Sequence, residues 1–196
     1  GFMKVPFSAK KLGADMISIS GHKIHAPKGI GALYIKTGVK IKPLIRGGAQ
    51  EGGMRAGTEA MPQIAAFGKA AEIAFSGMKD NCDTMASLRV LAMSTICADI
   101  PEAQIIGGGA PHILSVSLPG WRSEVLMNFL EAEGIYVSRS SACKKGGRSH
   151  VLEAMRLPAQ VIDGAIRVSF SRYNTEDDVL ALCSALKRAH DTLAHR

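Results

Sequence analysis

The chain has 196 residues, of which 46% are hydrophobic and 21% charged, proportions that are ordinary for a globular protein. No stretch approaches the roughly 20 apolar residues that a membrane-spanning helix needs, and we expect no signal peptide at the start. The net charge of +7 suits an anionic ligand or partner. Its basic residues are scattered, without zinc-finger spacing or an RNA-binding aromatic motif, so we do not expect nucleic-acid binding.

The four cysteines, Cys82, Cys97, Cys143 and Cys183, are far apart and form no C-x-x-C pair. We therefore expect neither a metal site nor a disulfide framework, and a reducing cytoplasm is the expected location. Three of them fall in helical patterns and are expected to be small buried residues, whereas Cys143 falls in a loop. A strand-like segment follows Gly1 almost at once, so we expect the sequence to be a piece of a longer protein.

The first part of the chain combines short strands, glycine-rich turns and long helices. In chain order we predict strands over 15–20 and 31–36, an extended stretch over 39–45, a glycine-rich loop over 46–58, and a helix from Pro62 followed by a second to about Ile100. Gly77 and the polar residues after it interrupt the helical pattern, so we place a domain boundary near residues 76–85.

The second part alternates strands and helices. We predict a strand over 113–118, a helix over 123–133 with Ser123 as N-cap, a strand over 135–138, a polar loop over 139–147, a short helix over 150–155, a strand over 165–171 and a last helix that opens with a capping box at Thr175 and Asp178. Alternation in the strand 165–171 places Ile166 and Val168 on one face and Arg167 on the other.

The first candidate site follows the strand 15–20, in the turn Ser20-Gly21-His22-Lys23. A lysine beside a hydroxyl and an imidazole is able to form a Schiff base with an aldehyde cofactor while its neighbours hold a phosphate. The alternative is a surface lysine in a glycine-rich turn, and four residues alone do not decide between the two.

Three further residues carry candidate chemistry. Thr58 ends the glycine-rich loop, where its hydroxyl and the backbone amides suit a phosphate, although a plain surface loop is the better reading of that segment alone. Cys143 lies in a loop of small and basic residues, and Lys144 and Lys145 favour its reactive thiolate form. Arg167 suits a carboxylate held through two parallel hydrogen bonds, although alone it reads as a solvent-facing arginine.

These four segments, in this order, resemble the motifs of cysteine desulfurases, which are pyridoxal-phosphate enzymes of the class V aminotransferase family. The matching segments are Ser20-Gly21-His22-Lys23-x-x-x-Pro27-Lys28-Gly29, the block from Gly47 to Thr58, Ser141-Ala142-Cys143, and Ile166-Arg167-Val168-Ser169. The resemblance covers essentially the whole chain.

The resemblance implies an α/β fold of the pyridoxal-phosphate-dependent aspartate-aminotransferase type. Residues 1–80 would be the C-terminal part of the large cofactor-binding domain, with the lysine motif and the glycine-rich loop. Residues 81–196 would be the small α/β C-terminal domain with the catalytic-cysteine loop.

The resemblance also implies roles for the residues that would bind the cofactor. Lys23 would form the Schiff base with pyridoxal 5'-phosphate, and Ser20 and His22 would hold its phosphate. Thr58 would reach the cofactor of the other subunit in a homodimer.

On the substrate side, Arg167 would bind the carboxylate of L-cysteine, and Cys143 would take the substrate sulfur as a persulfide. The products would be L-alanine and a persulfide for a sulfur-acceptor protein, either an iron–sulfur scaffold or a tRNA-thiolation protein.

The family's large domain begins before the residue that matches Gly1, so part of the cofactor site is expected outside this sequence. We therefore expect the chain alone to be inactive. Two alternatives stay open: a selenocysteine lyase or other class V enzyme, and an inactive fragment that acts as a binding module.

Overall fold

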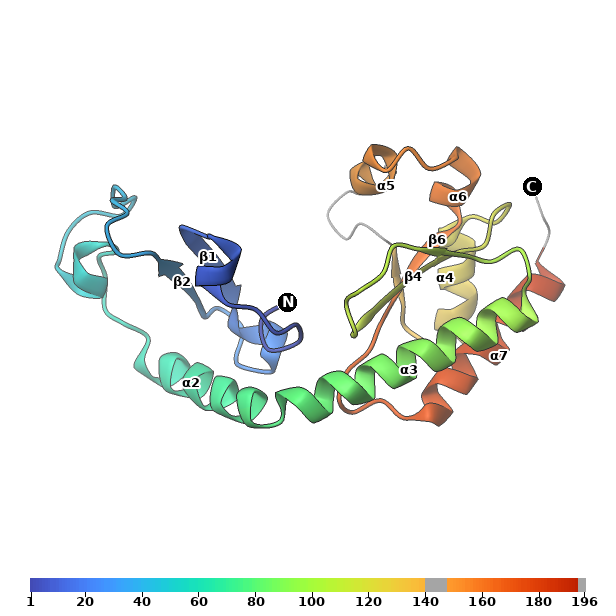
Figure 1. The fold of residues 1–196 in the computed structure, drawn as a ribbon, viewed down its shortest axis with the longest axis horizontal. Helices are drawn as coiled ribbons and strands as arrows, with labels where there is room; N and C mark the ends of the chain where they lie inside the picture. Colours follow the sequence, from blue (N-terminus) through green and yellow to red (C-terminus); the bar gives the residue numbers. More distant parts are fainter. Residues whose placement is uncertain (140–147, 194–196) are drawn as a thin grey trace. The chain divides into compact units, whose positions relative to one another are not determined.

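The structure, a computed structural model, describes residues 1–139 and 148–193. It divides into two compact units, Gly1–Lys79 and Asp80–Arg196, each of which is described by itself (Figure 1). Helices and strands occur together, as an α/β fold requires. None of the helices in the described ranges combines the length and apolarity that crossing a bilayer demands.

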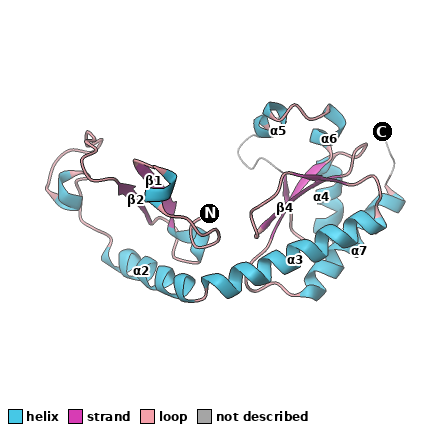
Figure 2. Cartoon of the chain, in the orientation of Figure 1, coloured by secondary structure: helices cyan, strands magenta, loops and turns pink. Residues whose placement is uncertain are grey.

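The first unit is built around a two-stranded antiparallel ribbon that long loops surround (Figure 2). Its elements are α1 (Ala9–Leu12), β1 (Met16–Ser20), the 3-10 turn η1 (Gly21–Ile24), β2 (Gly31–Ile35), the 3-10 turn η2 (Gln50–Gly53) and α2 (Met61–Ser76). Both predicted strands and the helix after Pro62 are confirmed. The stretch 39–45 forms no strand, and α1 was not predicted.

The first unit buries very little apolar surface. Among its described residues only Gly21, Ile24 and Ala26 are buried. By contrast Leu44 is 95% exposed and Phe75, on α2, is 68% exposed. Since burial of apolar surface is the main favourable contribution to folding, this unit has little stability of its own.

The second unit is a four-stranded antiparallel sheet with helices on both faces. Its elements are α3 (Met78–Asp99, whose first two residues belong to the first unit), β3 (Gln104–Ile106), β4 (Ile113–Ser117), α4 (Ser123–Ala132), β5 (Ser138–Arg139), α5 (His150–Ala154), α6 (Ala159–Asp163), β6 (Ala165–Ser169) and α7 (Glu176–Thr192). The strand order is β3-β4-β6-β5.

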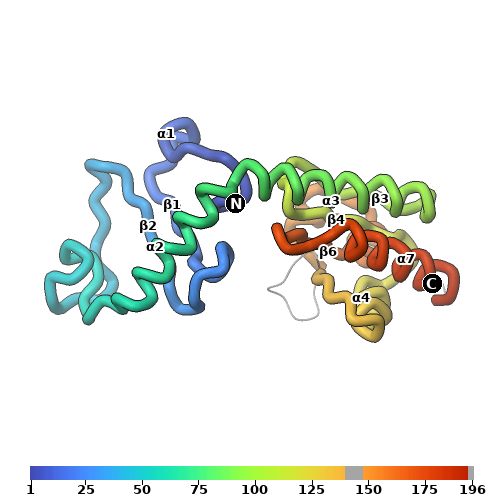
Figure 3. Tube along the Cα trace, turned by 90° about the horizontal axis from the view of Figure 1, so that it is seen from below, coloured from blue at the N-terminus to red at the C-terminus, as the bar shows by residue number. Residues whose placement is uncertain are grey.

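One face of this sheet forms the main core. Leu114, Val116, Ile166 and Val168 pack there against α3, α4 and α7, and Figures 1 and 3 show α3 and α7 side by side. The buried stripe of α7, with Val179, Leu182, Leu186 and Ala189, has the helical spacing seen in the sequence. The predicted strand alternation is confirmed, because Ile166 and Val168 lie in this core.

The opposite face is covered at one end by α5 and α6. Leu152 and Ile162 pack there on Ala165, together with the half-buried Ile106 of β3. The buried hydroxyl of Ser117 donates a hydrogen bond of 2.7 Å to the carbonyl of Val161 and ties α6 to β4. Part of this face therefore remains open for a site.

The helix ends show one correct and one wrong prediction. The capping box of α7 is confirmed: the Thr175 hydroxyl accepts from the Asp178 amide, and the Asp178 carboxylate accepts from the Thr175 amide. These hydrogen bonds lower the pKa of Asp178. Ser123 is not the N-cap of α4, because the extended backbone of Arg122 takes that place and Ser123 is already helical.

Two other expectations are corrected. Of the strand predicted over 135–138 only Ser138 pairs with β6, with Arg139 following it, so β5 has two residues. Cys183 is buried, but Cys97 is exposed and Cys82 is half-buried. Cys97 follows directly after the buried stripe of α3 that ends at Ile96, so it is turned by about 100° away from the core.

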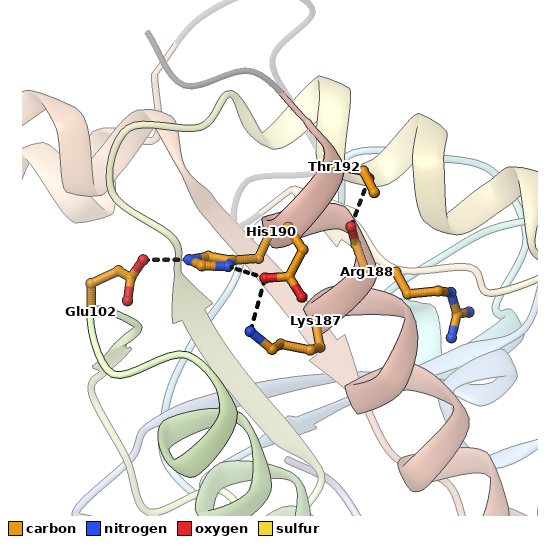
Figure 4. A network of polar contacts seen from close by, with 6 residues as sticks. Glu102, Lys187, Arg188, His190 and Thr192 are labelled. Carbon is orange, nitrogen blue, oxygen red and sulfur yellow. Dashed lines mark hydrogen bonds and ion pairs between the residues drawn. The ribbon is translucent and has the colours of Figure 1, made fainter.

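A charged cluster holds the last turn of α7 against the rest of the second unit (Figure 4). The imidazole of His190 contacts the carboxylates of Glu102 through Nε2 and of Asp191 through Nδ1, and Lys187 pairs with Asp191 at 2.8 Å. The His190 ring also lies 4.9 Å from the ring of Trp121, centroid to centroid. Hydrogen bonds with Asp191 and then Glu102 raise the pKa of His190 above its usual value of 6.5.

We predict that His190 makes unfolding pH-dependent. Because the folded protein prefers the imidazolium, its contribution is fully present below the unfolded pKa of 6.5 and is lost as pH rises through the raised folded pKa. The substitution His190→Gln should therefore lower the free energy of unfolding, and the loss relative to the wild type should be larger at about pH 5.5 than at about pH 9. Urea titrations followed by Trp121 fluorescence measure this difference, and an equal deficit at both pH values would contradict it.

We also predict that replacing Gly164 by any larger residue destabilises the second unit. A Cβ built there would lie 2.1 Å from the carbonyl oxygen of Leu118 and 3.1 Å from the hydroxyl of Ser117. Gly164→Ala should destabilise the second unit by more than about 2 kcal/mol, because overpacking costs about 1–3 kcal/mol and backbone atoms cannot yield easily. Gly108→Ala is the matched control, since a Cβ there meets only the end of the Arg89 side chain at 3.6 Å. Similar urea midpoints for the two variants would refute the prediction.

Candidate active site

The turn that carries Lys23 is fixed by two glycines with crowded surroundings. A Cβ on Gly21 would lie 2.9 Å from the side chain of Ile30, and one on Gly31 would lie 2.5 Å from the carbonyl oxygen of Ile19. The amide of Gly21 donates to the carbonyl of Ile30 at 2.9 Å, which closes the loop between β1 and β2. The 3-10 turn η1 is therefore held at the end of β1 and packs on α2.

Within this turn the polar side chains face solvent. Ser20, His22 and Lys23 are exposed, while Ile24 beside them is buried. Among the described residues, the hydroxyl of Ser20 and the ring of His22 make no hydrogen bond that would occupy them. A hydroxyl, an imidazole and an amine are thus presented together, and this donor set fits a group with both an aldehyde and a phosphate.

Lys4 adds a second cation that the sequence did not single out. Burial lowers the pKa of Lys4, and the charge of Lys23 lowers it further. The two ammonium groups are therefore close enough to interact, although they are 19 positions apart along the chain. Like charges gathered in this way are relieved when an anion binds between them.

Thr58 lies in the same unit as the lysine turn, at the end of the glycine-rich loop. Its loop contains a left-handed run at Glu51, Gly52 and Gly53, and the amide of Gly57 donates to the side-chain oxygen of Gln50 at 3.2 Å. Thr58 is exposed, and none of its described contacts joins it to Lys23.

Arg167 lies in the middle of a row that crosses the second unit's sheet. It pairs with Ser115 of β4 on one side and with Ser138 of β5 on the other. Cross-strand partners share a face, so all three point away from the main core. The side-chain Nε of Arg167 and the hydroxyl of Ser115 are both buried and have no hydrogen-bond partner within the described ranges.

Cys143 lies outside the described residues. The residues on either side of that segment are described, and each makes an ion pair: Arg139 with Glu124 at 2.7 Å, and Arg148 with Asp163 at 2.7 Å. The Arg148 hydrogen bonds lower the pKa of Asp163. These four side chains line one cavity of about 200 Å³.

The structure therefore groups the candidates in two places. Ser20, His22 and Lys23 stand together in the first unit, and Arg167 lies in the second. The sequence analysis missed Ser115, although the alternation in the predicted strand 113–118 already turned it away from the core. Over the described ranges, no three His, Cys, Asp or Glu side chains gather as they would around a metal ion.

Comparison with known proteins agrees with the class that the fold and the motifs define. Residues 1–182 match the aminotransferase class-V family, and the chain belongs to this family. The resemblance inferred from the four motifs is thus confirmed. The family and its cysteine desulfurase members depend on pyridoxal phosphate, which is the cofactor that the resemblance implied.

Particular relatives are named cysteine desulfurases. The chain is 42% identical over 181 residues to cysteine desulfurase 2 of Trichormus variabilis, a match that covers 90% of this chain and 45% of the relative. It is 41% identical over 180 residues to cysteine desulfurase IscS of Methanosarcina thermophila, covering 89% of this chain and 44% of that one.

A solved structure described as a NifS-like protein superposes on 98% of this chain and 51% of its own, with a TM-score of 0.88 and 39% identity. The predicted fold of pyridoxal-phosphate enzymes is therefore confirmed. The chain spans about half the length of the relatives that it matches.

The described cysteines should differ sharply in reactivity. Burial raises the pKa of Cys183 to about 11, and its Sγ lies 3.9 Å from the carbonyl of Ala92. Only about one thiol in a thousand at this position would be ionised at about pH 8. We predict that iodoacetamide alkylates Cys97 in the native chain and leaves Cys183 unmodified until the protein unfolds. Peptide mass spectrometry would show this, and equal rates at the two sites would disprove it.

Proposed function

We propose that the whole protein to which this chain belongs is a cysteine desulfurase that uses pyridoxal phosphate. Residues 1–80 would complete its large cofactor domain, and residues 81–196 would be its small domain. The observation that carries the proposal is that one chain holds both an exposed lysine turn, in its first unit, and a half-buried arginine, in its second unit, whose Nε has no partner within the described ranges. These two features suit an aldehyde cofactor and a carboxylate substrate.

In this proposal different residues of the chain bind different parts of the cofactor. Lys23 anchors the cofactor, and Ser20 and His22 hold its phosphate. Thr58 would reach the cofactor of the second subunit in a homodimer. The cofactor, when bound, supplies an electron sink for the bonds broken in the substrate.

The substrate side would depend on Arg167 and Cys143. Arg167 holds the carboxylate of L-cysteine and so orients the thiol of the substrate. The Cys143 thiolate attacks the substrate sulfur, the carbon–sulfur bond breaks, and a sulfur–sulfur bond forms. L-cysteine and the Cys143 thiol thereby give L-alanine and a Cys143 persulfide, so all atoms are accounted for.

The persulfide would pass to an acceptor protein, either an iron–sulfur scaffold or a tRNA-thiolation protein, in the cytoplasm. One relative named IscS favours an iron–sulfur role. The basic net charge of +7 would suit an acidic acceptor surface.

We also propose that this chain alone does not turn over L-cysteine. The relatives are about twice as long, and the first unit buries few of its apolar side chains. A polypeptide that corresponds to the preceding half of a relative would cover this surface and complete the cofactor site.

The test is complementation. The chain is mixed with L-cysteine and pyridoxal phosphate, alone and after co-expression with the preceding half of the Trichormus variabilis enzyme, and alanine and sulfide are measured. We expect products only from the co-expressed pair. Lys23→Ala should remove both the cofactor absorbance and the products, whereas Cys143→Ser should keep the absorbance and lose the products.

Three results would contradict these proposals. Robust turnover by the chain alone would contradict its inactivity. Full activity of the Cys143→Ser pair would remove the sulfur-transfer role of that thiol. Alanine formed from selenocysteine but not from cysteine would favour a selenocysteine lyase instead.

A further inference from the structure

Ser115 and Arg167 present two unpaired donors side by side. They are direct partners across β4 and β6, so their Cβ atoms lie about 4.5–5.5 Å apart on the same face of the sheet. The row continues to Ile106 on β3, which packs against α5 and α6, and to Ser138 on β5. Ser115 and Arg167 therefore lie beside the small apolar cluster that Ile106 forms with α5 and α6.

Both donors are buried without a partner among the described residues. These are the Nε of Arg167 and the hydroxyl of Ser115. Leaving a buried polar group unpaired is unfavourable, and native proteins keep few such groups. Two of them on adjacent strands indicate a ligand that accepts hydrogen bonds from both at once.

The charge of the site narrows the choice of ligand. No ion pair of Arg167 occurs within the described ranges, whereas Arg139, Arg148 and Arg188 of the same unit each pair with a carboxylate. A carboxylate is planar, carries one negative charge and accepts several hydrogen bonds. It is able to take one from the guanidinium and one from the hydroxyl.

We propose that Ser115 is a second donor to the substrate carboxylate, next to Arg167, and helps to select α-amino acids over amines without that group. This inference rests on the proposed function, because it assigns the carboxylate of that same substrate. Ser115 acts by binding and orienting the substrate, and it takes no proton from it.

A Ser115 that binds substrate and a Ser115 that supports the fold affect the stability of the chain differently. In the unliganded chain the Ser115 hydroxyl has no described partner, so its removal loses no hydrogen bond there. Ser115→Ala should therefore leave the urea midpoint of the second unit unchanged or slightly raised. A clear loss of stability would mean that Ser115 supports the fold, and it would overturn the proposal.

The binding test uses the chain itself and needs no cofactor. The Nε–H resonance of Arg167, assigned by its disappearance in Arg167→Lys, is followed by NMR while L-alanine is added. L-alaninamide, which lacks the carboxylate, is the matched probe. We expect a saturable shift with L-alanine and none with the amide.

Variants of the chain then measure the contribution of the Ser115 hydroxyl to L-alanine binding. Ser115→Ala should weaken L-alanine binding by about tenfold or more, as expected for a hydrogen bond to a charged group. Ser115→Thr, which keeps the hydroxyl, should retain most of the binding. Ser169→Ala is the control, since Ser169 lies on the same face of β6 and is exposed. It should bind as the wild type does.

Each remaining outcome counts against the proposal. No saturable shift in the wild type would mean that the two donors bind no carboxylate, and equal shifts with both probes would mean that binding does not depend on the carboxylate. Unchanged binding by Ser115→Ala would leave Arg167 as the sole donor. Because cofactor and sulfur transfer take no part in this test, a failure of the proposed desulfurase activity would not affect its result.

Discussion

The antiparallel register between β4 and β6 is the constraint on which the second unit depends. It sets Leu114 and Val116 beside Ile166 and Val168 in the main core. By the same alternation it turns Ser115 and Arg167 to the opposite face. A slip of β6 by one residue would turn the guanidinium of Arg167 toward the core and move Ile166 and Val168 out of it, so packing enforces the position of the arginine.

The two units differ in how far their own residues stabilise them. In the second unit α3, α4 and α7 together bury one face of the sheet, and the sulfur of Cys183 on α7 contacts the backbone of α3. In the first unit the ribbon of β1 and β2 has no buried residue on either strand. The backbone conformation of the lysine turn is nevertheless fixed, because Gly21 and Gly31 allow neighbouring segments to approach closely.

The electrostatic surroundings of Arg167 differ from those of the other arginines in the second unit. Arg148 binds Asp163 through two hydrogen bonds, and Arg188 is paired with Glu133. These partly exposed pairs contribute little to stability, since water screens them. Arg167 is different, because its Nε is buried and within the described ranges no carboxylate neutralises it. A group of this kind has most to gain from an anionic ligand.

The sequence by itself determined the family and most of the elements, because local signals predict them: motif spacing, strand alternation at Arg167, and the capping box at Thr175. The tertiary structure alone decided which side chains meet across strands and which helix faces are covered. It brought Ser115 to Arg167 and Lys4 to Lys23, and it exposed Cys97. Such contacts join residues far apart in the chain, so no local pattern encodes them, and burial depends on the neighbours that packing supplies.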